Sequence, residues 1–243
     1  MKRALLVTAI MMLTATSSYA GIRNSKHDLS SANSNNVSQL KSTTQNQVCI
    51  FCHTPHNAGS TSQLWNRRSA SSQASAYKMY SSPSTSSAVN SVKSLDNTSS
   101  SYKCLTCHDI SFTDLKLSGA LYNNSQGTMN NLLSQTTWDS VYRIGNSPNL
   151  QQVGTGGDLR DDHPVHFDYA AAVNAARTQL QPLATAINNL KINGNTNVFP
   201  GNKMECGSCH LVHNEQDANN TGASYLLRRP ETGSQICLSC HIK

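Results

Sequence analysis

Apolar and polar positions along the chain follow a regular period only in places. Residues 54–103 are rich in Ser, Thr and Asn without a sustained period, which predicts loops with one short helix near residues 75–80. The Ala-rich segment 169–180 predicts the clearest helix, which Pro182 should end or kink before a helix resumes over 183–190. The pattern predicts a mostly irregular fold with a few short α-helices and little or no β-sheet.

The strongest apolar run, residues 4–13, directly follows Lys2 and Arg3 and precedes a polar stretch that ends in a small residue. This arrangement is typical of a secretory signal peptide over residues 1–20, and the run is well below the roughly 20 residues that span a bilayer. We expect cleavage to leave a single exported domain, 21–243, without a transmembrane segment.

Composition argues against a conventional core. Only 13% of the 243 residues are charged and 6% are aromatic, while Ser, Thr and Asn make up about a third of the chain. Ordering each residue costs about 1–2 kcal/mol, so a chain this polar needs something beyond its own side chains to stabilise it. A highly charged disordered tail, a coiled coil and a polytopic membrane protein are unlikely classes for such a composition.

The cysteine pattern indicates a bound group that could provide this additional stabilisation. All eight belong to four copies of one pentapeptide, Cys-x-x-Cys-His, and no cysteine is left over for a disulfide framework. A His directly after every Cys-x-x-Cys pair also disfavours redox dithiols. The covalent attachment residues are therefore predicted to be Cys49, Cys52, Cys104, Cys107, Cys206, Cys209, Cys237 and Cys240.

The spacing has a chemical reason. Two thiols on one turn can each form a thioether to a vinyl group of the same haem, and the next residue then presents its imidazole to the iron. This predicts four covalently bound haem c groups, with structural zinc as the alternative use of paired Cys and His residues. The proximal iron ligands are predicted to be His53, His108, His210 and His241.

Five further histidines can fill the second axial positions, His27, His56, His163, His166 and His213. Methionine competes for this role, but Met79, Met129 and Met204 lie in uninformative contexts. We therefore predict four bis-histidine haems of fairly low potential, since methionine ligation raises the potential.

Two of these histidines have informative positions. His56 and His213 each follow a proximal histidine by three residues, on the same side of the chain, so each should ligate a haem other than the one bound by its own motif. His163 precedes Pro164 and follows two aspartates, with His166 as its rival three residues away.

The fourth candidate, His27, lies near the start of the mature chain, where a lone histidine is usually exposed. Four sites need ligands and candidates are few, so we take the distal ligands as His27, His56, His163 and His213.

Four stretches together resemble the multihaem cytochromes of metal-respiring bacteria, and within them the extracellular tetrahaem cytochromes of the OmcE type that polymerise into nanowires. These stretches read Lys26-His27-Asp28-Leu29-Ser30, Cys49-Ile50-Phe51-Cys52-His53-Thr54-Pro55-His56-Asn57-Ala58, Asp162-His163-Pro164-Val165 and Ile236-Cys237-Leu238-Ser239-Cys240-His241-Ile242-Lys243. The resemblance favours His163 over His166, and it implies that His56 ligates the last haem of an adjacent subunit.

The functional expectation is electron conduction by hopping through closely spaced haems, with no enzymatic turnover. We expect identical subunits in a head-to-tail filament, redox partner proteins and an extracellular electron acceptor, at the cell surface or beyond it. A monomeric periplasmic tetrahaem shuttle is the alternative. A multihaem oxyanion reductase is a third, although it would need a vacant iron, often marked by Lys in place of the motif's His.

Net charge does not point to nucleic acid. Cleavage removes Lys2 and Arg3 and lowers the formal charge from +6 to +4. The propionates and ferric irons of four haems then bring it to about zero, and near-neutral charge is compatible with self-association.

Overall fold

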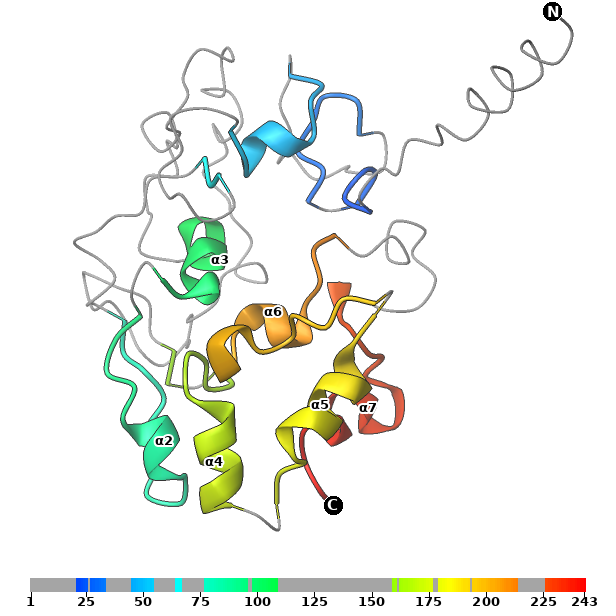
Figure 1. The fold of residues 1–243 in the computed structure, drawn as a ribbon. Helices are drawn as coiled ribbons and strands as arrows, with labels where there is room; N and C mark the ends of the chain where they lie inside the picture. Colours follow the sequence, from blue (N-terminus) through cyan, green and yellow to red (C-terminus); the bar gives the residue numbers. More distant parts are fainter. Residues whose placement is uncertain are drawn as a thin grey trace, which may run out of the picture.

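The computed structural model describes residues 21–25, 27–33, 45–54, 64–66, 77–95, 98–108, 159–160, 162–176, 179–192, 194–213 and 226–243 (Figure 1). Over these residues the chain is mostly loop, with short helices and isolated β-bridges in place of strands, as the sequence predicts. The helices are α2 (Ser87–Asn90), α3 (Ser100–His108), α4 (Tyr169–Ala175), α5 (Leu183–Leu190), α6 (Cys206–Cys209) and α7 (Gln235–Leu238). The 3-10 turns are η1 (Cys49–Phe51), η6 (Pro200–Asn202) and η8 (Thr232–Ser234).

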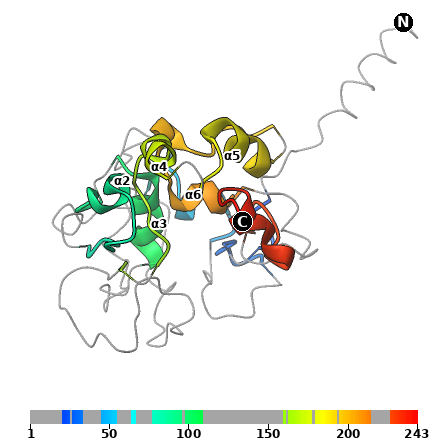
Figure 2. The ribbon, with the colours of Figure 1, turned by 90° about the horizontal axis from the view of Figure 1, so that it is seen from below.

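Helix α6 lies in the middle of this arrangement. Figure 1 shows α2, α3 and α4 on one side of it and α5 and α7 on the other, and Figure 2 shows the same order from below. Helix α2 packs against α4, α3 against α6, and α4 against α5. The third Cys-x-x-Cys-His motif, which forms α6, is therefore central among the described helices.

The predicted helix over 183–190 is confirmed as α5, which begins directly after Pro182. The predicted helix over 169–180 is too long, because Ala176 leaves the helical region at φ −127° and ψ 48° and ends α4 there. Leu180 instead forms a β-bridge with His241. A contact with a distant segment therefore overrides the local preference for helix.

The short helix predicted near residues 75–80 is wrong for the described residues 77–80, which are extended. Tyr77 and Met79 alternate into a buried cluster, and the Lys78 carbonyl accepts a hydrogen bond from Leu159 at 2.9 Å. The helix of this region is α2. The Asn90 side-chain amide at its end donates to the carbonyls of Ser82 and Thr85 in the preceding loop and so holds that loop against the helix.

Most buried apolar residues of the described chain fall into three clusters. The largest joins α4 and α5 to the fourth motif, and Tyr169 is at its centre, 1% exposed. The Tyr169 ring stacks on Phe199 with a centroid distance of 4.6 Å, and its hydroxyl contacts the carbonyls of Gln181 and Cys240. Burial also raises the pKa of the Tyr169 hydroxyl, so this group remains a donor.

Candidate haem-attachment sites

Three of the four motifs share one backbone hydrogen bond. In each, the His N–H donates to the carbonyl of the first Cys, which closes a single turn over the pentapeptide. The three bonds are His53 to Cys49 at 2.8 Å, His210 to Cys206 at 2.9 Å and His241 to Cys237 at 2.8 Å.

A second segment pins each of these turns from outside. The three bridges pair His53 with Trp65, His210 with Leu227 and His241 with Leu180. In each case the carbonyl of the second Cys also accepts a backbone N–H, from Asn66, Arg228 and Gln181 respectively, at 2.7–2.8 Å. The direction of each proximal imidazole is thus set by backbone hydrogen bonds on both sides.

The second motif differs because it continues a longer helix. Cys104 lies on α3, and the Cys104 thiol contacts the Ser100 carbonyl at 3.8 Å. The backbone of α3 extends to His108, but the side chains of Cys107 and His108 lie outside the described residues.

Two pairs of imidazoles face each other across a gap. The ring centroids of His53 and His213 are 6.1 Å apart, and those of His163 and His241 are 6.4 Å apart. A bond from a metal to an imidazole nitrogen is about 2 Å long, so two imidazoles on opposite sides of one metal have their ring centres about 6 Å apart. Both pairs have the separation that one iron between them would require.

The electrostatics of both pairs favour the form that binds a metal. Burial lowers the pKa of His163, as does the nearby His241, against a raising effect from its bond to the Pro164 carbonyl. Burial and the neighbouring His53 lower the pKa of His213. Both rings therefore favour the neutral imidazole, which is the metal-binding form.

Ring orientation separates His163 from its rival. The Nδ1 of His163 bonds to the Pro164 carbonyl at 2.9 Å, which leaves Nε2 to accept a metal. In His166, Nδ1 bonds to Glu205 at 2.8 Å and Nε2 bonds to Lys203 at 3.1 Å. Both nitrogens of His166 are therefore engaged by other side chains.

The other two candidate distal ligands are His27 and His56. The described segment 27–33 carries His27 and lies beside the first motif, where Leu29 packs against Phe51. His56 lies outside the described residues.

The third and fourth motifs share a cavity of about 440 Å³. Cys206, Cys209 and His210 line it from one side, and Cys237, Cys240 and His241 line it together with His163. Burial raises the pKa of Cys209 to about 11 and that of Cys240 to about 12, as expected for thiols against an apolar wall. That wall is formed by Leu105, Leu159, Val165, Met204, Leu227 and Ile236.

The residues fit a covalently bound haem on two further grounds. No disulfide forms among the seven described cysteines, so none of their sulfur atoms is consumed by a disulfide there and each can form a thioether. Arg228 is 4% exposed, and its Nε donates to the Gly207 carbonyl at 2.8 Å inside the third motif. Its Nη1 is buried and has no hydrogen-bond partner among the described residues, which suits an acidic group such as a haem propionate.

Sequence reasoning missed the residues that support the motifs. Glu205 and Arg228 both contact the third motif. Only 13% of the residues are charged, so a charged residue close to a motif was the sequence signal that could have identified such supporting residues. The pinning segments 64–66, 179–181 and 226–228 have in common only an apolar middle residue, so they could not be recognised in advance.

Over the described residues, the side chains alone form neither a metal-ion cluster nor a membrane-spanning helix. There, no group of three or more His, Cys, Asp or Glu side chains is placed to hold a metal ion by itself. Nor does that part of the chain contain a helix with the length and apolar character needed to cross a membrane.

Comparison with known families gives one match. Residues 199–243, which contain the third and fourth motifs, match the family described as "Doubled CXXCH motif". A search of curated proteins found no match to the chain. The doubled motif indicates covalently bound haem c and points to a multihaem c-type cytochrome.

Proposed function

We propose that this multihaem chain is an electron-transfer protein with four bis-histidine haems, through which electrons pass by hopping. When bound, the haems supply a reversible one-electron iron couple. The observation that carries the proposal is the pairing of His53 with His213 and of His163 with His241, at 6.1 and 6.4 Å. An iron with imidazoles on both sides has no open position for a substrate, so this geometry favours electron transfer over catalysis.

The supply of histidines supports a full set of ligands. Of the nine histidines, four belong to the motifs and His166 is engaged by Glu205 and Lys203. The remaining four match the four distal positions in number. We assign His213 to the first motif and His163 to the fourth, which leaves His27 and His56 for the second and third.

The third motif is close to each of the others. Helix α3, which carries the second motif, packs against α6 of the third motif, and the Cys206 N–H donates to the Ser101 hydroxyl of α3 at 2.8 Å. The fourth motif shares the cavity of the third. His213, three residues after His210, faces His53 of the first motif. Short separations of this kind favour fast exchange of electrons, with the third haem as the junction.

We further propose that the protein acts outside the cell as the subunit of a filament. The four stretches that resemble nanowire cytochromes support this, and so do two exposed apolar side chains at the fourth motif, Leu238 at 37% and Ile242 at 43%. In this assignment His163 already serves the fourth motif. A donated His56 therefore ligates a haem of the second or third motif of its neighbour, in place of the last haem that the resemblance implies.

The test is cryo-electron microscopy of the native holo-protein recovered from outside the cells, combined with its mass and visible spectrum. We expect a mass increase of four haems, low-spin spectra for all of them, and filaments with a continuous haem chain. Monomers confined to the periplasm would favour the shuttle. A high-spin haem in the wild-type protein would contradict the proposal that the protein only transfers electrons, and it would favour a reductase.

A further inference from the structure

A buried carboxylate lies between the second and third motifs. Glu205 is 3% exposed and directly precedes Cys206. Its Oε2 accepts hydrogen bonds from the Ser99 hydroxyl at 2.8 Å, the Ser101 hydroxyl at 2.5 Å and the Ser101 backbone N–H at 3.1 Å. Its Oε1 is 2.8 Å from the Nδ1 of His166. Four donors thus converge on one side chain.

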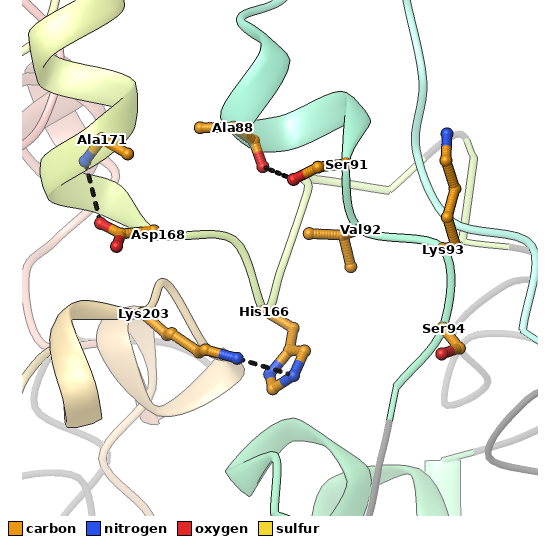
Figure 3. A pocket seen from close by; sticks show the side chains of 9 residues that line it. All are labelled: Ala88, Ser91, Val92, Lys93, Ser94, His166, Asp168, Ala171 and Lys203. Carbon is orange, nitrogen blue, oxygen red and sulfur yellow. Dashed lines mark hydrogen bonds between the residues drawn. The ribbon is translucent and has the colours of Figure 1, made fainter.

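The hydrogen-bond pattern assigns the charge of this carboxylate. The Lys203 ammonium can only donate, so the Nε2 of His166 accepts from it (Figure 3). The Nδ1 of His166 therefore carries the proton that is donated to Glu205. Burial alone would raise the pKa of Glu205, but the bonds from His166, Ser101 and Ser99 outweigh it and the pKa falls below its usual value. Glu205 is therefore an anion at neutral pH.

This anion is held rigidly against the haem-attachment turn. The Ser101 hydroxyl accepts from the Cys206 N–H at 2.8 Å while it donates to Glu205, which joins α3 to α6. Glu205 also lines the cavity that Cys206, Cys209 and His210 line. A fixed charge away from water interacts with a nearby redox centre much more strongly than a solvated one does.

We propose that Glu205 sets the potential of the haem on the third motif by stabilising its oxidised, more positive form and so lowering its reduction potential. This inference rests on the proposed function, since it requires a haem at Cys206 and Cys209. Glu205 is a positioning and tuning residue, and it takes no part in ligating the iron.

Other charges near Glu205 do not change the sign of the effect. Lys103 on α3 is half-buried and interacts with Glu205, and Lys203 faces the far side of His166 from an adjacent pocket of about 480 Å³. The thiol of Cys206 is consumed when the haem is attached. These cations offset part of the field, but replacing Glu205 with a neutral residue still removes one negative charge from beside the cavity.

The first experiment is a spectroelectrochemical titration of the Glu205→Gln holo-protein, with haem signals assigned by NMR. We expect the midpoint of the third haem to move to a more positive potential while all four haems stay attached and low-spin. The matched control is Glu231→Gln, which makes the same change at an exposed residue of the same cavity and should shift that midpoint much less. Equal shifts in the two variants, or none in Glu205→Gln, would overturn the proposal.

A second variant keeps the test decisive if Glu205→Gln does not fold. Ser101→Ala retains the carboxylate but removes one donor to it, so the pKa of Glu205 should rise. Protonation of Glu205 on acidification removes its negative charge, so the reduction potential of the third haem should rise as the pH falls. In Ser101→Ala this rise should begin at a higher pH than in the wild type, and an unchanged dependence of the potential on pH would contradict the proposal. Loss of haem or of low-spin spectra in the wild-type protein would instead refute the proposed function, so the two failures are distinguishable.

Discussion

At the scale of residues, the chemistry depends on which nitrogen of an imidazole is left available. His163 and His166 lie three residues apart, and the sequence could narrow the ligand to these two without choosing between them on the residues alone. The choice depends on partners that are distant in sequence, because Glu205 and Lys203 engage both nitrogens of His166. Within the described residues, the Nδ1 of His163 bonds to the Pro164 carbonyl, and the ring centroid of His163 is 6.4 Å from that of His241.

This difference predicts opposite spectra for two matched variants. His163→Ala should leave the fourth iron with one open position, so that one of the four haems becomes high-spin and binds carbon monoxide when reduced. His166→Ala should keep all four haems low-spin. Visible and electron paramagnetic resonance spectra of the purified holo-proteins measure both, and a high-spin haem in His166→Ala alone would reverse our assignment.

Glu205 also links stability to pH. Its pKa is below the ordinary value of 4.5, so its contribution to stability is fully present above pH 4.5 and is lost as the pH falls through its folded-state value. Glu205→Gln should cost about 1–3 kcal/mol at pH 7, because buried donors lose a charged partner, and the variant should lose less on acidification than the wild type. Denaturant unfolding of the holo-protein at pH 7 and pH 4 measures this, and parallel losses in both proteins would refute it.

At the scale of elements, the recurring unit is the five-residue turn with its pinning segment. The turn itself was predictable, because Cys-x-x-Cys-His fixes its chemistry and its length. The start of α5 was predictable too, because a proline interrupts a helix that reaches it but is tolerated at the beginning of the next one, as Pro182 is here. The early end of α4 was not, since it depends on the bridge between Leu180 and His241, which joins segments that are distant in sequence.

The hydroxyl of Tyr169 couples α4 to the fourth motif. It donates to the carbonyls of Gln181 and Cys240 at 2.9 and 3.2 Å, so Tyr169→Phe should lower the free energy of unfolding by about 1 kcal/mol. Tyr80→Phe is the control, because the Tyr80 ring packs against the same cluster without a hydrogen bond from its hydroxyl to the described residues. Equal destabilisation of the two variants, measured by guanidinium unfolding, would exclude this coupling.

At the scale of the whole molecule, the described core is divided into three small clusters, and a cavity lies where the third and fourth motifs meet. The sequence predicted this irregular architecture correctly from its polar composition. It could not predict which histidines pair, because His53 and His213 come from opposite ends of the chain and meet only in the folded protein.

A core divided in this way should not hold without its cofactors. We expect the chain expressed without haem attachment to lack a cooperative thermal unfolding transition, because haem that binds only the native state supplies the missing apolar surface. Circular dichroism and calorimetry of the apo-protein test this against the holo-protein. A sharp transition in the apo-protein would show that its side chains suffice.

A haem ligand that is donated between subunits would make iron coordination and polymerisation one event. If His56 completes a haem of the neighbouring subunit, His56→Ala should leave four haems attached, abolish filaments and turn one haem high-spin. His27→Ala is the matched control: it should also open one haem, but within its own subunit, so filaments should persist. A head-to-tail contact that does not close repeats without limit, so electron micrographs of the two variants distinguish these outcomes directly. Filaments formed by His56→Ala would mean that no subunit donates this ligand to another.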